Sequence, residues 1–146
     1  MKNFLQKITF SFLFFICFSS NAQNPDVSLL VEKISNDDAY IVMLKTMSPR
    51  LNSEAGNQII AIGKKATTDL IPFLDKENKG IAVHFMLSEI WKDKWEEEIC
   101  CNIYDSDTSE IVTINGLKIY IQGNKLFSKT DDLKKNKEIW KKFSET

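Results

Sequence analysis

The pattern of apolar and polar positions divides the chain into a helical part, a β part and a final helix. Up to Trp95, apolar residues recur at intervals of three and four, the period of a helix that buries one face. Five helices are therefore predicted over about residues 26–95. After Trp95 the pattern changes to the alternation of strands over about residues 99–127, and a last helix follows over about residues 130–144.

Capping residues and helix breakers set the boundaries of the first three helices. Asp26 is suited to cap the first helix, because its carboxylate can accept from free backbone N–H groups. The second helix carries the apolar residues of segment 39–47 and ends before Pro49, since the residue preceding a proline avoids the helical region. Ser53 opens the third helix, and Gly63 ends it.

The next two helices differ in how well their sequences suit a helix. The fourth is predicted to start at Thr67 or Thr68, which places Pro72 close enough to the first turn to be tolerated. The fifth, over about residues 81–95, is apolar around most of its circumference. A helix of this kind is covered on several sides, so we expect it at the centre of the fold.

The β part contains two turn signals. Asn115-Gly116 separates the apolar runs 111–114 and 117–121, and Asn-Gly readily adopts the positive φ angles of a two-residue hairpin turn. Gly123-Asn124 then leads into residues 125–127, which completes a three-stranded meander.

Two further elements complete the predicted fold. Residues 99–104 can add an edge strand, and Thr130 can cap the final helix. The predicted class is α+β and mainly α: antiparallel helical hairpins, then a small β-hairpin or meander, then a C-terminal helix.

Packing residues in the middle of the chain follow a regular spacing: Ile60-x-x-Gly63-x-x-Ala66-x-x-x-Leu70-Ile71-x-x-Leu74-Asp75, then Val83-x-x-x-Leu87-Ser88-x-Ile90. This stretch, about residues 54–91, resembles a HEAT-type helical repeat. The resemblance implies stacked antiparallel helix pairs whose second helices line a protein-binding surface, with a third pair over residues 26–47. Ser88 stands where the family often has Gly, and the arginine common at the start of a repeat is absent.

The first 22 residues have the order of parts of a secretory signal peptide. Lys2 and Lys7 precede the apolar run 8–18, and Ser20-Asn21-Ala22 supplies the small residues before a cut at Gln23. The run is too short to span a bilayer, which takes about 20 residues, so no membrane span is expected to remain. We expect an exported protein, periplasmic or extracellular, with residues 23–146 as a single domain. The chain also resembles small secreted bacterial proteins of unknown function.

Composition and charge exclude one class of partner. With 43% apolar and 27% charged residues, the chain has the composition of an ordinary globular protein. Removing residues 1–22 takes away two lysines and no acidic residue, so the net charge changes from −1 to −3. A nucleic-acid-binding protein needs a basic face, so we do not expect nucleic acid as a partner.

The candidates for catalysis and metal binding are few. His84 is the only histidine, with Ser88 four residues later on the same helical face, and we interpret it as a packed or rim residue rather than a catalytic base. Cys100 and Cys101 could be free thiols, a vicinal disulfide or an intermolecular bridge. They provide too few ligands for a zinc site, so neither a metal nor a cofactor is expected.

A binding surface is the remaining functional signal. Glu96, Glu97 and Glu98 form an acidic cluster at the end of the fifth predicted helix, where acids are not favoured by the helix dipole. Trp95, flanked by charged residues, is the best candidate for an exposed aromatic anchor. We therefore predict a non-enzymatic binding or scaffold module whose partner is another protein. The alternatives are an inhibitor or immunity-type protein that neutralises a basic partner, and a small carboxylate-based hydrolase.

Overall fold

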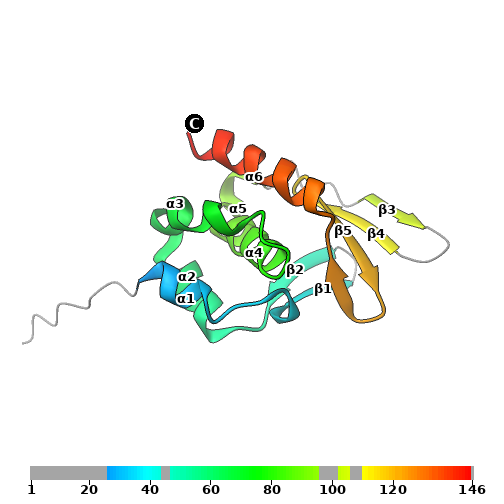
Figure 1. The fold of residues 1–146 in the computed structure, drawn as a ribbon, viewed down its shortest axis with the longest axis horizontal. Coiled ribbons are helices and arrows are strands. Elements are labelled where there is room, and N and C mark those ends of the chain that lie inside the picture. The colour runs from blue at the N-terminus through cyan, green and yellow to red at the C-terminus, as the bar shows by residue number, and fades with distance from the viewer. Residues whose placement is uncertain (1–25, 44–46, 96–101, 106–109, 146) are drawn as a thin grey trace, which may run out of the picture.

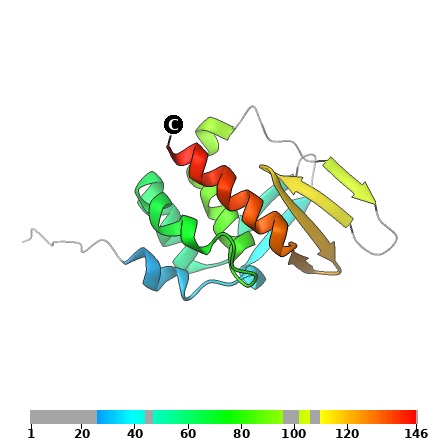
Figure 2. The same cartoon turned by 45° about the horizontal axis from the view of Figure 1, so that its top comes forward.

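The computed structural model describes residues 26–43, 47–95, 102–105 and 110–145. It is an α+β structure in which helices gather at one end and a four-stranded antiparallel sheet lies at the other (Figures 1 and 2). A separate two-stranded hairpin packs between them. The predicted class is confirmed at this level.

The chain enters the described part through two short helical segments. Helix α1 (Val27–Val31) is capped by Asp26, whose carboxylate accepts from the backbone N–H of Ser28, as the sequence predicted. The 3₁₀ helix η1 (Asn36–Asp38) follows, and a capping box between Ser35 and Asp38 satisfies backbone N–H groups at its start.

The predicted second helix is wrong. Strands β1 (Ala39–Met43) and β2 (Met47–Leu51) form an antiparallel hairpin there, which also removes the third helix pair that the HEAT-type resemblance implied. Consecutive β-branched Ile41 and Val42 favour a strand, and pairing with β2 decides the outcome. Pro49 is tolerated because β2 is an edge strand of a sheet with two strands.

The boundaries of the third predicted helix are confirmed. Helix α2 (Glu54–Ile62) begins after Ser53, whose hydroxyl accepts from the backbone N–H of Gly56. It ends at Gly63, which has a φ of 72°, a conformation that glycine adopts without a steric cost.

The fourth predicted helix is broken into short pieces. After the 3₁₀ helix η2 (Gly63–Ala66), helix α3 (Thr67–Leu70) ends before Pro72, and the 3₁₀ helix η3 (Ile71–Phe73) contains the proline at its start. Proline lacks an N–H group and crowds the preceding turn, so a regular helix does not continue through it.

The fifth predicted helix is central, as expected. Every residue of helix α4 (Gly80–Ile90) from Gly80 to Ser88 is buried. The helix ends earlier than predicted, because Trp91 leaves the helical conformation (ψ 14°) and donates its indole N–H to the Thr67 hydroxyl at 3.0 Å. Helix α5 (Lys92–Trp95) is a separate short turn.

The predicted meander is confirmed, and the edge strand predicted over residues 99–104 is described as β3, which starts at Asn102. Strands β3 (Asn102–Asp105), β4 (Glu110–Ile114), β5 (Leu117–Gln122) and β6 (Lys125–Phe127) lie in this order and are all antiparallel. Asn115 and Gly116 have φ angles of 46° and 83°, as a type I′ turn requires.

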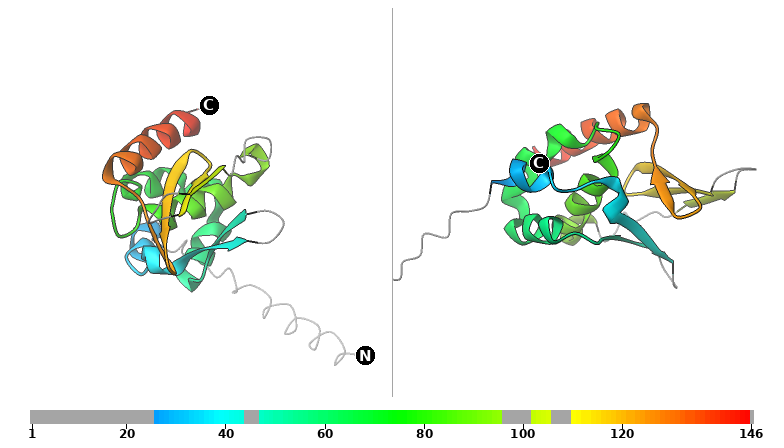
Figure 3. Two further views of the ribbon diagram at one scale, coloured as in Figure 1. Left: turned by 90° about the vertical axis from the view of Figure 1, so that its right-hand side faces the viewer. Right: turned by 60° about the horizontal axis from the view of Figure 1, so that its bottom comes forward.

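The C-terminal helix closes the core. Helix α6 (Thr130–Ser144) buries Leu133, Asn136 and Trp140 on one side and runs from beside the four-stranded sheet to the helical end of the molecule (Figure 3). Thr130 is its first residue and not its cap, because Lys129 occupies the capping position without a side-chain bond. The Thr130 hydroxyl instead donates to the Glu77 carboxylate at 2.6 Å.

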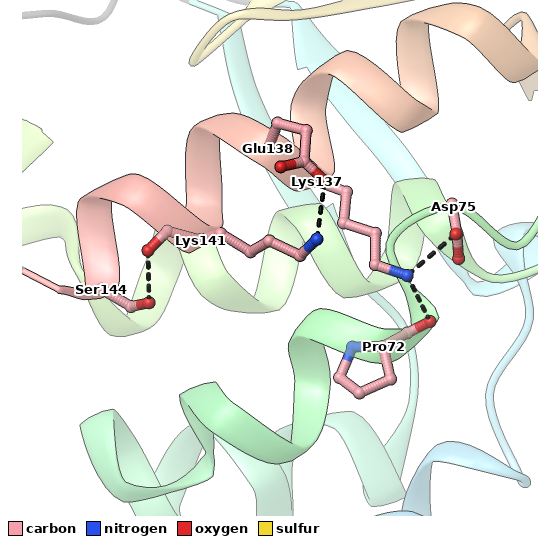
Figure 4. Close-up of polar contacts among 6 residues, drawn as sticks. All are labelled: Pro72, Asp75, Lys137, Glu138, Lys141 and Ser144. Atoms are coloured by element: carbon pink, nitrogen blue, oxygen red, sulfur yellow. Dashed lines mark hydrogen bonds and ion pairs between the residues drawn. The ribbon is translucent and has the colours of Figure 1, made fainter.

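Polar contacts attach α6 to the segment after α3. The Lys137 ammonium donates to the Asp75 carboxylate at 2.8 Å and to the Pro72 carbonyl oxygen at 3.3 Å (Figure 4). This ion pair lowers the pKa of Asp75, through the hydrogen bond first and the charge of Lys137 second, against the opposing effect of burial.

Candidate functional site

A groove of about 380 Å³ lies between strand β1 and the four-stranded sheet. One side is formed by Tyr40 and Ile41 of β1. The other side and the floor come from the four-stranded sheet and its β5–β6 turn: Glu110, Ile121, Gly123, Asn124 and Leu126. We call this site the β1–β6 groove.

The floor of the groove is the part of the sheet's core-facing side that the core does not fully cover. Alternate residues of a strand share a face, so Ile121 continues the face on which Leu117 and Ile119 are fully buried. Glu110 and Leu126 are its partners on the neighbouring strands. These three residues form a row across β4, β5 and β6 that is only partly buried.

Both strands that border the groove have an unpaired edge within the described sheets. β1 pairs only with β2, and β6 pairs only with β5, yet β1 and β6 contact each other across the groove. An unpaired edge presents backbone N–H and C=O groups that can accept another strand.

Two side chains give the groove its chemical character. Tyr40 is 46% exposed, which is unusual for a large aromatic residue and suits an anchor for a partner. Glu110 is the only charged residue among those that line the groove, and its carboxylate forms no ion pair with the described residues. The groove therefore favours a ligand that is apolar and carries a positive charge.

The second candidate feature is a buried cluster around His84, which is fully buried as the packed-histidine interpretation predicted. The Trp140 indole N–H donates to His84 Nδ1 at 3.0 Å, and an indole nitrogen is never an acceptor. Nδ1 is therefore unprotonated, and the proton lies on Nε2, which donates to the carbonyl oxygen of Ile114 at 2.8 Å. The histidine joins α4 to β4 and α6.

Burial lowers the pKa of His84 from 6.5 to about 4, against the opposing effects of the Ile114 carbonyl and the neighbouring Asn136 amide. Asn136 lies close enough to favour the charged ring, but its amide makes no hydrogen bond in this geometry, and the Ser88 hydroxyl makes none either. With both ring nitrogens engaged, His84 has no free lone pair with which to activate Ser88. Its arrangement is that of a structural residue.

The predicted binding and thiol residues lie mostly outside the described part of the chain. Trp95 is the last residue of α5, and only its backbone is described. The acidic residues 96–98 and the cysteines 100 and 101 fall outside the described residues, so these assignments stay predictions.

The described part of the chain holds neither a candidate metal site nor a membrane-spanning helix. Among residues 26–43, 47–95, 102–105 and 110–145, no three His, Cys, Asp or Glu side chains lie where they could hold a metal ion. The described helices also include none with the length and apolar character needed to cross a membrane. Compared with known proteins, the chain matches no family model, no curated protein and no solved structure.

The β1–β6 groove was not predicted from the sequence, because segment 39–47 was predicted to be a helix. A groove between β1 and the sheet requires β1 to be a strand. Two signals could have identified it: the adjacent β-branched residues Ile41 and Val42, and Pro49, which is compatible with an edge strand.

Proposed function

We propose that this chain is an exported, non-enzymatic protein-binding module that holds an extended segment of its partner in the β1–β6 groove. The observation that carries the proposal is the position of an apolar hollow between two strands with unpaired edges. In such a groove, backbone hydrogen bonds from one edge supply affinity, and pockets for alternate side chains supply selectivity.

The lining residues support a partner segment of defined chemistry. Ile41, Ile121 and Leu126 offer contacts to an apolar side chain, and Tyr40 beside them provides a large contact area with few rotatable bonds. Glu110 would pair with a lysine or arginine near that apolar residue. The expected ligand is an extended peptide that combines apolar and basic residues.

Two parts of the proposal rest on the sequence alone. Export rests on the signal-peptide pattern of residues 1–22. The HEAT-type assignment of about residues 54–91 rests on the spacing of packing residues. In this proposal the helices act as the scaffold that positions the β1–β2 hairpin.

The test is selection of short linear peptides from a random display library on residues 23–146. Enriched peptides should share apolar residues and a lysine or arginine, and they should protect β1 amides from hydrogen exchange. Tyr40→Ala and Glu110→Gln should each weaken binding about tenfold, the effect of losing a contact worth roughly 1.4 kcal/mol.

Gln122→Asp provides the matched control. Gln122 is exposed next to Ile121 but points to the other face of β5, so this change should leave peptide binding intact. Peptides whose binding is insensitive to both groove variants, or whose contacts map to another face, would overturn the proposal.

A further inference from the structure

A second hollow, of about 230 Å³, borders strand β2 of the β1–β2 hairpin. β2, α2 and α4 line it, and no residue that lines the β1–β6 groove takes part. Pockets for drug-sized ligands usually measure roughly 300–1,000 Å³, so this hollow suits a smaller molecule.

The floor of this hollow is apolar, and its polar groups come from three different elements. Phe85 of α4 is only 3% exposed, and Leu51 and Ile60 flank it. The polar groups are Arg50 of β2, Asn57 of α2 and Glu89 of α4.

The charges of this hollow are arranged for a ligand with two opposite charges. Arg50 and Glu89 line the same space, but no ion pair joins them, and the Arg50 side chain has no ion-pair partner among the described residues. Glu89 Oε1 accepts from Lys92 Nζ at 2.7 Å, which leaves Oε2 without a hydrogen bond in the described part of the chain.

Each group matches one part of a small zwitterion. A guanidinium is permanently charged and binds carboxylates through two parallel N–H donors. A carboxylate oxygen accepts from an ammonium group, and the Asn57 amide can bind either end. The apolar floor would hold an aliphatic side chain.

We propose that this hollow, the Arg50–Glu89 site, binds a free α-amino acid with an apolar side chain. Arg50 holds the carboxylate, Glu89 holds the ammonium group, and the aliphatic side chain lies on Phe85 and Ile60. No residue lines both this site and the proposed peptide groove, although Tyr40 of the groove and Arg50 of the site are cross-strand partners in the hairpin.

The experiment is a titration of the ¹⁵N-labelled mature chain with L-leucine, followed through the side-chain N–H signals of Arg50 and Asn57. Saturable shifts of both signals are expected. Arg50→Gln and Glu89→Gln should each weaken binding by at least about tenfold, because each removes a hydrogen bond between charged groups. Lys65→Gln, which removes an exposed cation elsewhere on the surface, should leave binding unchanged.

Matched ligands test each charge separately. L-Leucinamide lacks the carboxylate and resembles a peptide N-terminus, whereas N-acetyl-L-leucine lacks the ammonium group and resembles a peptide C-terminus. Both should bind at least about tenfold more weakly than L-leucine. Equal binding of either derivative would overturn the assignment in favour of a peptide end.

Absence of binding would also overturn the proposal. At about 10 mM L-leucine, a site with a Kd near 1 mM would be mostly filled, so unsaturated or absent shifts would exclude it. Peptide selection on the β1–β6 groove is a separate measurement, so failure at one site does not decide the other.

Discussion

The side chain of Asn36 caps helix α4 from 46 residues away in the sequence. Its Oδ1 accepts from the backbone N–H of Ala82 at 3.1 Å and from that of Ile81 at 3.0 Å. These are the N–H groups that a capping residue normally satisfies from the helix's own N-terminus. Lys79, which occupies that position, makes no such bond.

Lys79 instead stabilises the end of α1. Its ammonium donates to three backbone carbonyl oxygens near the end of that helix: Val31 at 2.9 Å, Glu32 at 3.2 Å and Ile34 at 2.9 Å. Cations are favoured at a helix C-terminus, where carbonyl groups lack partners. The start of α4 and the end of α1 therefore satisfy each other's backbone groups through two exchanged side chains.

Replacing Asn36, which is half-buried, should destabilise the fold. Asn36→Ala removes the acceptor for two N–H groups at the start of the central helix, and also the donor to the Glu77 carbonyl oxygen. We expect a loss of about 1–2 kcal/mol in the free energy of unfolding, measured by urea denaturation.

Two variants separate the cap from other effects. Asn36→Asp keeps an acceptor at the helix N-terminus, where negative charge is favoured, and should retain most of the stability. Ser35→Ala removes the cap of a three-residue 3₁₀ helix and should cost less than Asn36→Ala. Equal stabilities of the wild type and Asn36→Ala would show that the remote cap contributes nothing.

Burial of His84 predicts a specific dependence of stability on pH. Its pKa is lowered from 6.5 to about 4 in the folded state, so the unfolded chain binds a proton more readily between these values. The stabilisation is complete above pH 6.5 and decreases as the pH falls towards 4. The total loss is roughly 3 kcal/mol, at up to about 1.4 kcal/mol per pH unit.

Urea unfolding at several pH values between 4 and 7 tests this dependence. His84→Gln, which keeps a side-chain N–H donor, should be less stable at pH 7 but show a flatter profile. Since His84 is the only histidine, its ring signals in an NMR titration report the folded pKa directly. A folded pKa near 6.5 would contradict the prediction.

The elements that could be predicted from the sequence are those whose structure is determined locally. The Asn115-Gly116 turn, the Ser53 cap and the Gly63 stop depend on residues adjacent in the chain, and all three were confirmed. The strand β1 depends on pairing with β2, and the break at Trp91 depends on a hydrogen bond to Thr67. Local patterns do not contain such tertiary contacts.

The same distinction applies to the candidate sites. His84 was predicted to be a packed or rim residue because its neighbours in the sequence are apolar, and it is fully buried. The β1–β6 groove and the Arg50–Glu89 site each combine elements that are far apart in the chain, so single-sequence patterns could not assemble them. A buried histidine follows from local sequence, whereas a groove between sheets follows from topology.

The ion pair between Lys137 and Asp75 should contribute measurably to stability. These side chains are 19% and 29% exposed, and Lys137 also donates to the Pro72 carbonyl oxygen (Figure 4). Lys137→Met should lower the free energy of unfolding at pH 7 by about 1–2 kcal/mol, because the Asp75 carboxylate loses its partner. The pair's contribution should disappear as the pH falls through the lowered pKa of Asp75, since the carboxyl group is then neutral.

Lys141 supplies a matched control on the same helix. Its ammonium pairs with Glu138 at 2.7 Å, but the two side chains are 45% and 61% exposed. Exposed pairs are usually worth less than about 1 kcal/mol, so Lys141→Met should change stability little. Equal effects of the two substitutions would show that partial burial does not strengthen the Lys137 pair.

The close approach of α4 to its neighbours explains the glycine at its start. A Cβ at Gly80 would lie 2.5 Å from the Leu74 carbonyl oxygen and 2.8 Å from Leu133 Cδ2. Alanine normally favours a helix over glycine by about 1 kcal/mol, but here the clash with a backbone oxygen should dominate. We expect Gly80→Ala to lower the free energy of unfolding by about 1–3 kcal/mol in urea denaturation.

Gly56 in helix α2 provides a comparison in which the added Cβ would crowd a side chain and not a backbone carbonyl group. A Cβ there would meet the side-chain end of Leu51, which can turn away at a smaller cost than a backbone carbonyl can move. Gly56→Ala should therefore be less destabilising than Gly80→Ala. If Gly80→Ala instead raised stability, α4 could shift relative to Leu74 without loss, and the remote cap from Asn36 would not hold its N-terminus in place.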